Sequence, residues 1–296
     1  MKLDYKLLEA LNAVVEEQGF DNAAKKLFIT QSAVSQRIKL LEENIGQPVI
    51  IRGQPIIKTS AGEKLLSHYK MVEQLENELI PELLPDMPKK PVKITLAINA
   101  DSIATWFFDA MAPLLKNYLI ELNILIENEK DTINKLRSGE AIGAVSRQST
   151  PLPSYQSFEL GQLKYMLVAS PEFSRRYFSE GVTRDSLKMA PGISYDSKDD
   201  MHQHFIAKHY NLAASEYYCH NVRSSEAFVN LTKRGLAYSL ISELQIKSEL
   251  KSGELINLCP DKVLIETLYW HSWVLVKGVN KKISQEIVSA AQKLLS

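Results

Sequence analysis

Residues 20–52 constrain the fold of this chain more than any other segment. Two short helical patterns occur there, at residues 22–28 and 31–41, and only Ile29 and Thr30 separate them. In the second pattern Val34, Ile38 and Leu41 follow i, i+4, i+7 spacing, which predicts one buried helix face. The hydroxyl of Thr30 is placed to cap that helix. Together with apolar positions of a preceding helix at residues 7–15, the spacing predicts a helix-turn-helix unit.

The other face of the second helix carries amide, hydroxyl and cationic side chains. No acidic residue occurs between Asn22 and Leu41. Amides and hydroxyls read base edges in the major groove of DNA, and cations hold phosphates. The alternative is an ordinary helical hairpin whose polar face is solvated.

A wing follows this helix and favours the DNA-binding interpretation. Residues 49–52 and 56–58 read as two short strands, joined by a turn at residues 53–55. Such a wing lies near the DNA backbone or the minor groove. The predicted contacts to double-stranded DNA are Thr30, Gln31, Ser32, Ser35, Gln36, Arg37, Lys39 and Arg52.

Bulk composition neither supports nor excludes this interpretation. The formal net charge of the 296 residues is zero, but positive charge is concentrated between residues 25 and 58. Local charge decides phosphate attraction, because screening limits it to about 8 Å at physiological salt. The two cysteines lack metal-ligand spacing, and we expect no metal or cofactor. The amino terminus lacks an apolar export segment and no long apolar run occurs, so we expect a cytoplasmic, nucleoid-associated protein without membrane contact.

Residues 59–80 read as one long helix. Leu65, Val72 and Leu79 recur at seven-residue spacing, which favours a coiled-coil-like stripe and therefore a homodimer. A helix that lies on its own domain is the alternative. Prolines at positions 81, 85, 88 and 91 then predict a hinge.

The remainder of the chain alternates between strand and helix patterns, which implies parallel sheets with right-handed crossovers. Predicted strands cover residues 92–98, 122–126, 142–146, 165–169, 193–195, 237–241 and 265–276, and a further strand is predicted around Cys219. Predicted helices cover residues 103–118, 132–136, 172–178, 201–209, 225–233 and 281–295.

In combination these motifs resemble LysR-type transcriptional regulators of the arginine- and lysine-responsive ArgP subfamily, which is also described as the chromosome initiation inhibitor IciA. The resemblance covers essentially the whole chain. It rests on residues 23–52 and 59–62, and on residues 99–106, 143–146, 199–203, 224–229 and 268–271 of the carboxyl-terminal part.

The resemblance implies an α+β multidomain architecture. A winged helix-turn-helix domain would cover residues 1–58, and a linker or dimerisation helix with its hinge residues 59–90. An effector-binding domain would cover residues 91–296, as two α/β subdomains of the periplasmic-binding-protein type. Subdomain I would comprise about residues 91–163 and 271–296, and subdomain II about residues 164–270. The last helix is expected to return to subdomain I.

Ligands of open α/β sheets sit beyond the carboxyl ends of strands, often at helix N-termini. The residues expected to face such a crevice are Asn99, Asp101, Ser102, Glu127, Ser146, Asp200, Ser224 and Ser225. Simple helix capping is the alternative for Ser102 and Ser224. A buried carboxylate is costly unless it is paired, so acidic residues in the crevice favour a cationic ligand.

The resemblance identifies that ligand as L-lysine or L-arginine. It also implies a dimer of dimers, and RNA polymerase as a further partner. Two rival functions are a DNA-binding inhibitor of replication initiation and, in another class, a solute-binding module that does not bind DNA. The sequence contains no G-x-S-x-G nucleophile elbow, no P-loop and no G-x-G-x-x-G motif, and we predict no enzymatic activity.

Overall fold

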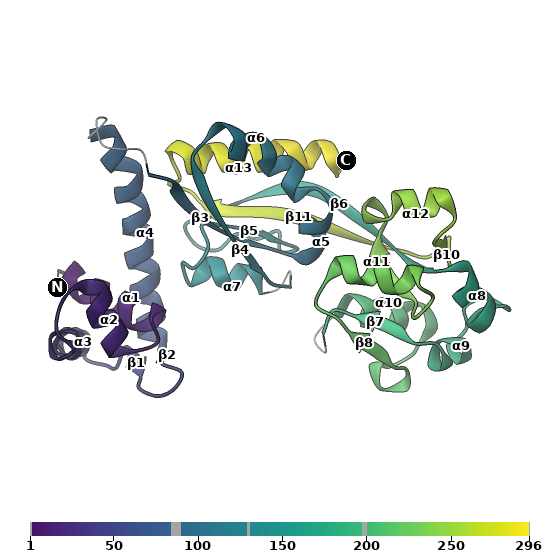
Figure 1. Ribbon diagram of the computed structural model, residues 1–296, viewed down its shortest axis with the longest axis horizontal. Coiled ribbons are helices and arrows are strands. Elements are labelled where there is room, and N and C mark those ends of the chain that lie inside the picture. Colours follow the sequence, from purple (N-terminus) through teal and green to yellow (C-terminus); the bar gives the residue numbers. More distant parts are fainter. Residues whose placement is uncertain (1, 84–89, 129–130, 197–199, 296) are drawn as a thin grey trace.

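The computed structural model describes residues 2–83, 90–128, 131–196 and 200–295. Three folded parts follow one another along the long axis of the molecule (Figure 1). A small helical unit stands at the amino-terminal end, a long helix connects it to a first α/β subdomain, and a second α/β subdomain lies at the far end.

The helix-turn-helix unit consists of α1 (Tyr5–Glu16), α2 (Phe20–Leu27) and α3 (Gln31–Ile45). Val34, Ile38 and Leu41 of α3 are buried against α1 and α2, so the predicted packing face is confirmed. The hydroxyl of Thr30 accepts a hydrogen bond from the Ala33 N–H at 3.2 Å, as expected of an N-cap.

The predicted wing is present as two short antiparallel strands, β1 (Ile50–Ile51) and β2 (Ile57–Lys58). Helix α4 (Ser60–Leu83) begins directly after it, and Thr59 Oγ1 caps its first turn by accepting from the Gly62 N–H at 3.1 Å. A Cβ at Gly62 would lie 2.0 Å from the Val49 carbonyl oxygen, so the wing and α4 meet at a distance that only glycine permits.

The predicted coiled-coil stripe on α4 is divided between two environments, which corrects its interpretation as a continuous partner surface. Leu65 and Tyr69 pack on the core of the helix-turn-helix unit, and the adjacent Leu66 is buried in it. Leu75 and Leu79 are instead exposed. The first half of α4 thus lies on its own domain because α1 leaves an apolar face open there.

A long sheet joins the two α/β subdomains. Its strand order is β10-β6-β11-β5-β3-β4, with β9 paired to β6. In the first subdomain β3 is parallel to β4 and β5, as the alternating pattern predicted, and α13 packs on α6 and β6. The last helix therefore returns to the first subdomain. The elements of this part are β3 (Val92–Ile98), α5 (Ala100–Thr105), α6 (Phe107–Asn117), β4 (Ile120–Ile126), α7 (Thr132–Arg137), β5 (Gly143–Ser146) and α13 (Gly278–Leu294).

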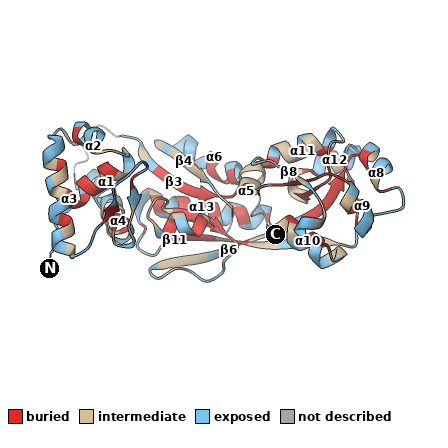
Figure 2. Ribbon diagram, turned by 90° about the horizontal axis from the view of Figure 1, so that it is seen from below, coloured by how far each residue is buried: buried red, intermediate tan, exposed pale blue. Residues whose placement is uncertain are grey.

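Strands β6 (Tyr155–Ala169) and β11 (Val263–Trp273) run antiparallel to each other and continue from one subdomain into the other. Buried residues line the sheet and the inner faces of its helices (Figure 2). The remaining elements of the second subdomain are α8 (Pro171–Tyr177), α9 (Arg184–Met189), β7 (Gly192–Ser194), α10 (Asp200–Tyr210), η1 (Ala214–Glu216), β8 (Cys219–Asn221), α11 (Ser225–Lys233), β9 (Ser239–Ser242), η2 (Glu243–Gln245), α12 (Lys247–Ser252) and β10 (Ile256–Asn257).

Several elements differ from their predicted form. In the seven-stranded sheet the predicted parallel pairing holds for β3 with β4 and β5, whereas β6, β9, β10 and β11 pair antiparallel. The helix predicted over residues 103–118 is two helices, α5 and α6, which meet at the buried Trp106. The Thr105 hydroxyl donates to the Asp101 carbonyl at 2.6 Å, a contact typical of bent helices. Strand β6 begins ten residues earlier than predicted, and Gly161, at φ +127°, lies where its pairing with β11 shifts register.

Three residues named in the sequence interpretation, Pro85, Pro88 and Asp199, lie outside the described residues. Within the described ranges, no helix is both long and apolar enough to cross a lipid bilayer.

The close contact at Gly62 allows a test of how the wing is anchored to α4. Replacing Gly62 with alanine would normally favour a helix, but here the added methyl group meets the Val49 backbone. We expect Gly62→Ala to destabilise the amino-terminal unit by about 1–3 kcal/mol, or to lower its thermal midpoint by about 5 °C. Circular dichroism measures this, with the exposed Glu63→Ala as control. An unchanged or raised midpoint would contradict the contact.

Candidate functional site

Helix α3 presents a polar surface to solvent. Gln31, Ser32, Gln36 and Lys39 are exposed, and Ser35 lies half-buried between them and the core. Thr30 is also exposed, but its hydroxyl caps the helix and contacts Ser32 Oγ at 3.0 Å. The predicted base-reading side chains therefore share one accessible helix face.

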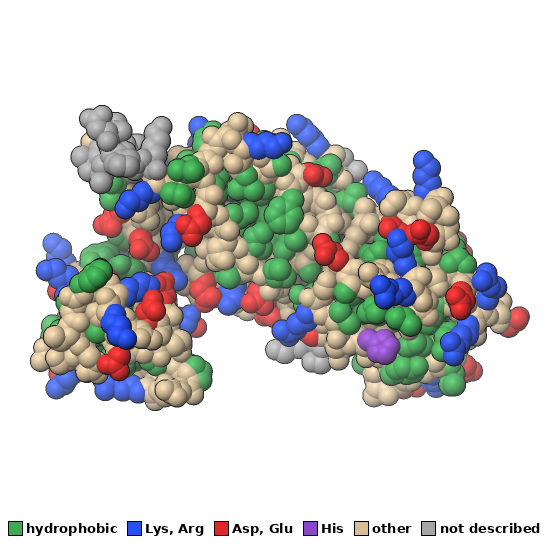
Figure 3. Space-filling view, in the orientation of Figure 1, with side chains coloured by type: hydrophobic (Ala, Val, Ile, Leu, Met, Phe, Trp, Pro, Cys, Tyr) green, Lys and Arg blue, Asp and Glu red, His purple; other side chains and the backbone are tan. Residues whose placement is uncertain are grey.

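Each of the cationic side chains assigned to this surface lies beside an acidic or an aromatic side chain. Arg37 Nη1 lies 3.9 Å from Glu9 Oε2, and the Arg52 guanidinium stacks 5.5 Å from the centre of the Phe20 ring. Lys39 is 74 % exposed beside Glu43. Lys and Arg side chains stand on the surface of the helix-turn-helix unit among mostly uncharged groups (Figure 3). The surface can hold phosphates, with Lys39 the least constrained of these three cations.

A pocket lies between the two α/β subdomains, where β3, β4 and β7 end. It is lined by Asn99, Ala100, Asp101, Glu127, Asn128, Ile193, Tyr195, Asp200, Met201, His202, Ser225, Phe228 and Leu240. Both subdomains contribute, so a bound molecule would contact both. Three of the lining side chains are carboxylates, and among the described lining residues there is no Lys or Arg.

Asp101 connects the two sides of this pocket. Its carboxylate accepts from the Tyr165 hydroxyl at 2.7 Å and from Ser225 Oγ at 2.6 Å. Asp101 belongs to α5, Tyr165 to the crossing strand β6 and Ser225 to the first turn of α11. One carboxylate thus joins the first subdomain, the crossing strand and the second subdomain.

The other two pocket carboxylates face cations behind the pocket wall. Asp200 Oδ1 lies 3.1 Å from Arg147 Nη2, and Arg147 Nη1 lies 3.1 Å from Glu266. Glu127 Oε1 lies 3.7 Å from Lys135 Nζ, which is a looser pair. Among these carboxylates Asp200 therefore has the shorter ion pair, and Glu127 is the more open to a second cation.

The negative potential of the pocket affects a neighbouring tyrosine. Burial raises the pKa of Tyr195, and the carboxylates of Asp101 and Glu127 raise it further, against the opposing effect of Arg223. A neutral phenol is favoured beside carboxylates because a phenolate would be repelled by them. Tyr195 therefore keeps its hydroxyl proton over the physiological pH range and can donate a hydrogen bond.

Of the eight residues predicted for the crevice, the structure brings five to the pocket: Asn99, Asp101, Glu127, Asp200 and Ser225. The other three lie outside its lining. Ser224 caps α11 by accepting from the Ala227 N–H, Ser146 accepts from the Gln148 N–H, and Ser102 is fully buried inside α5. The capping alternative therefore describes Ser224 but not Ser102, since Asn99 occupies the N-cap position of α5.

Sequence reasoning missed several lining residues. Asn128 follows Glu127 after β4, and Tyr195 comes directly after β7. Both sit at the carboxyl ends of strands, which is the same signal that identified Asp101 and Glu127. His202, on α10, also lines the pocket. Within the described ranges no group of three His, Cys, Asp or Glu side chains is arranged to hold a metal ion.

Comparison with known proteins settles the family. Residues 5–63 match the model of the bacterial regulatory helix-turn-helix protein, lysR family, and residues 92–275 match the LysR substrate binding domain. The chain belongs to the LysR family of transcriptional regulators.

Full-length relatives in this family are similar throughout. The HTH-type transcriptional regulator ArgP of Aeromonas salmonicida is 50% identical over 293 residues, which is 99% of this chain and 98% of the relative. ArgP of Salmonella typhi is 46% identical over 99% of this chain and 98% of the relative.

Solved structures agree. ArgP from Mycobacterium tuberculosis superposes with a TM-score of 0.87 at 34% identity, over 98% of each chain. LysG from Corynebacterium glutamicum with bound effector Arg superposes at 0.79 and 28% identity, over 98% of this chain and 99% of that one. The predicted LysR-type fold class and regulatory function are confirmed.

The Asp101 junction of this LysR-family pocket yields a direct test. Tyr165→Phe removes a buried hydroxyl that donates to Asp101. Hydrogen bonds to charged groups contribute about 1.5–3 kcal/mol, so we expect the thermal midpoint of the effector-binding part to fall by about 4 °C. Differential scanning calorimetry measures this. Tyr118→Phe is the matched control because its hydroxyl bonds only at the surface, to Lys282. Equal shifts for both variants would rule out the role given to Tyr165.

Proposed function

We propose that this regulator binds promoter DNA as a dimer and that a basic amino acid, L-lysine or L-arginine, controls it from the pocket between the subdomains. The observation that carries the ligand assignment is the acidic lining, with Asp101, Glu127 and Asp200 around one cavity. Because the DNA it acts on is the chromosome, we propose a cytoplasmic site of action on the nucleoid.

Electrostatics favours a ligand with two positive charges. Carboxylates gathered in a partly dry pocket repel one another, and a cationic ligand relieves that cost. Asp200 already has Arg147 at 3.1 Å, whereas Asp101 accepts from two neutral hydroxyls and Glu127 is 3.7 Å from Lys135. We therefore assign the ligand's cations to Asp101 and Glu127. The α-carboxylate of the ligand is assigned to the N-terminus of α11, beside Ser225, where the helix dipole favours an anion.

Relatives support this ligand class. The relative LysG is described with arginine bound as its effector, and its backbone superposes along nearly the whole chain. Several relatives of similar length carry the name ArgP. A ligand that contacts both subdomains would favour one angle between them, and this angle sets the position of the attached helix-turn-helix units.

For DNA binding, we propose that Gln31, Ser32, Ser35 and Gln36 approach bases and that Arg37, Lys39 and Arg52 hold phosphates. Their common face on α3 and the exposure of its amides support this assignment. Thr30 positions the helix by capping it, and its hydroxyl also lies near Ser32.

The dimer partner is a second copy of this chain. Leu75, Leu79, Ile80 and Leu83 leave apolar side chains exposed on the second half of α4. Burying them against the same helix of another copy removes apolar surface from water at about 25 cal/mol per Å². We further propose a dimer of dimers, with RNA polymerase as a later partner at the promoter.

The recognition face can be tested by substitution. Gln31→Ala and Ser35→Ala each remove a group assigned to a base edge, and a good base contact contributes about 1–3 kcal/mol of discrimination. We expect preference for operator over scrambled DNA to fall by about 5- to 100-fold, while salt-sensitive bulk binding persists. Gel-shift titrations measure both. Gln47→Ala, an exposed amide beyond the helix, is the control. Full discrimination by both variants would show that α3 is not the reading helix.

The ligand class can be tested by thermal shift over the twenty amino acids. We expect only L-lysine and L-arginine to raise the midpoint, since a ligand at about 100 times its Kd stabilises by about 2.7 kcal/mol. Asp101→Asn should abolish the shift, whereas Asp109→Asn, an exposed carboxylate on α6, should retain it. A flat profile for all twenty would refute the basic-amino-acid assignment.

A further inference from the structure

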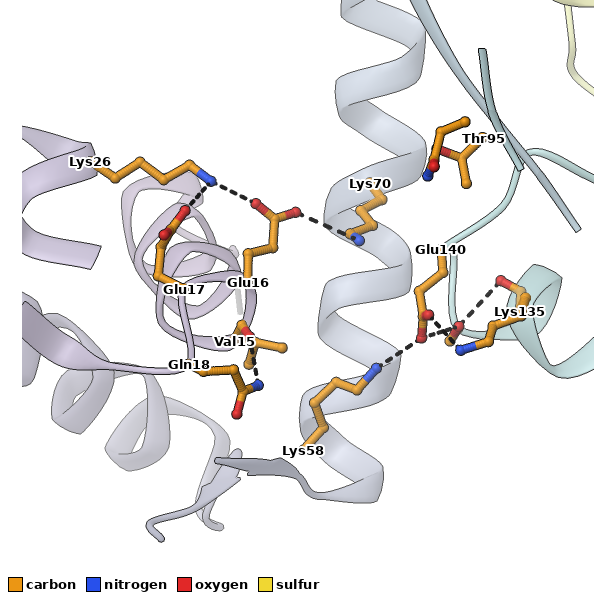
Figure 4. Close-up of polar contacts among 12 residues, drawn as sticks. Val15, Glu16, Glu17, Gln18, Lys26, Lys58, Lys70, Thr95, Lys135 and Glu140 are labelled. Atoms are coloured by element: carbon orange, nitrogen blue, oxygen red, sulfur yellow. Dashed lines mark hydrogen bonds and ion pairs between the residues drawn. The ribbon is translucent and has the colours of Figure 1, made fainter. Parts of the chain in front are cut away.

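A chain of alternating charges connects the pocket to the wing. Lys58, the last residue of β2, lies 3.2 Å from Glu140, and Lys135 of α7 lies 2.9 Å from the other oxygen of Glu140 (Figure 4). Lys135 also lies 3.7 Å from Glu127, which lines the pocket. The four side chains are between 24 % and 35 % exposed, so water screens them less than an open surface pair.

The backbone brings this chain of charges together tightly. Glu140 follows Gly139, whose φ is +70°, and a Cβ on Gly139 would lie 3.0 Å from the Ser67 Cα of α4. The turn between α7 and β5 therefore rests directly on α4, beside the place where the wing joins it. Through this contact, a structural change at Lys135 or Glu140 can affect the DNA-binding unit directly.

Glu140 and Lys135, the two inner side chains of this series of charges, are held in their charged form. Burial would raise the pKa of Glu140, but the hydrogen bond from Lys135 and the charge of Lys58 lower it to about 2. The hydrogen bond to Glu140 in turn raises the pKa of Lys135. Their mutual attraction is therefore present throughout the physiological pH range.

We propose that Glu127, Lys135, Glu140 and Lys58 form a charge relay through which a cation in the pocket weakens the hold of the first subdomain on the wing. The relay rests on the proposed function, because it requires a cationic ligand at Glu127. A ligand cation there displaces Lys135 from Glu127, which is the looser of the two partners of Lys135. Lys135 then pairs more fully with Glu140 and competes with Lys58 for its carboxylate.

The relay predicts that successive substitutions along it change ligand affinity in opposite directions. Lys58→Met leaves Glu140 with Lys135 as its remaining cationic partner among the described residues, beside the hydroxyl of Ser138. Lys135 then pairs more with Glu140 and less with Glu127, so the ligand binds more tightly. Glu140→Gln removes the competitor for Lys135, which then pairs with Glu127 and opposes the ligand. A coupling at the low end of the usual range corresponds to about a fivefold change in Kd in each direction.

Isothermal titration of L-arginine and L-lysine into the full chain tests this. Matched controls are Lys93→Met and Glu121→Gln, which remove one partner each from a surface pair 3.5 Å apart in the same subdomain. We expect tighter binding for Lys58→Met, weaker binding for Glu140→Gln and wild-type affinity for both controls. Circular dichroism verifies that every variant is folded.

The outcomes distinguish a failure of the relay from a failure of the proposed function. If the wild-type protein binds either amino acid but Lys58→Met and Glu140→Gln match their controls, or change affinity in the same direction, the relay is overturned and the proposed function stands. If the wild-type protein binds neither amino acid, the proposed function fails and the relay fails with it.

Discussion

One carboxylate, Asp101, joins the two α/β subdomains across the pocket that lies between them. The two subdomains share the long strands β6 and β11, which pair antiparallel. Asp101 adds short hydrogen bonds to Tyr165 on β6 and to Ser225 on α11, across the pocket. In the proposed function a ligand cation approaches these same oxygens, so ligand binding and subdomain geometry would involve the same group.

Under the proposed function, this shared use of one group would let a small ligand affect distant DNA. A ligand shifts an equilibrium only by its differential affinity for two arrangements. A pocket with contributions from both subdomains provides that difference, and contact of the turn at Gly139 with α4 links the first subdomain to the helix-turn-helix unit. The ion pairs at this contact are partly shielded from water. A change in the charge of a neighbouring group therefore affects them more than it would affect a fully exposed pair.

Much of the fold could be predicted from sequence because its signals are local. The apolar spacing of α3, the Thr30 cap and the β-α-β alternation from residue 92 each fix an element by short-range rules. The failures have physical causes. The half of α4 that packs on α1 and the half that remains exposed share one heptad pattern, so Leu65 and Leu79 look alike in sequence. The early start of β6 lies in a polar, glycine-containing segment whose strand character depends on pairing with β11.

The site was predictable to a smaller extent. Asp101 and Glu127 follow strands and carry charge, which singled them out. His202 lines the cavity because α10 brings it there, and Tyr165 reaches Asp101 because it lies on the crossing strand β6. The partners of each carboxylate could not be read from spacing, since Lys135, Arg147 and Ser225 are remote in sequence or belong to other elements.

Comparison of L-lysine with L-norleucine tests the central claim, that carboxylates in the pocket select a second positive charge. The two amino acids share the same six-carbon chain, but only L-lysine carries a terminal ammonium. Calorimetric titration into the full chain should give saturable binding of L-lysine and at least about a hundredfold weaker binding of L-norleucine, roughly the lower end of the range expected for an unpaired buried charge. Equal affinity for both would show that the acidic lining does not recognise the ligand.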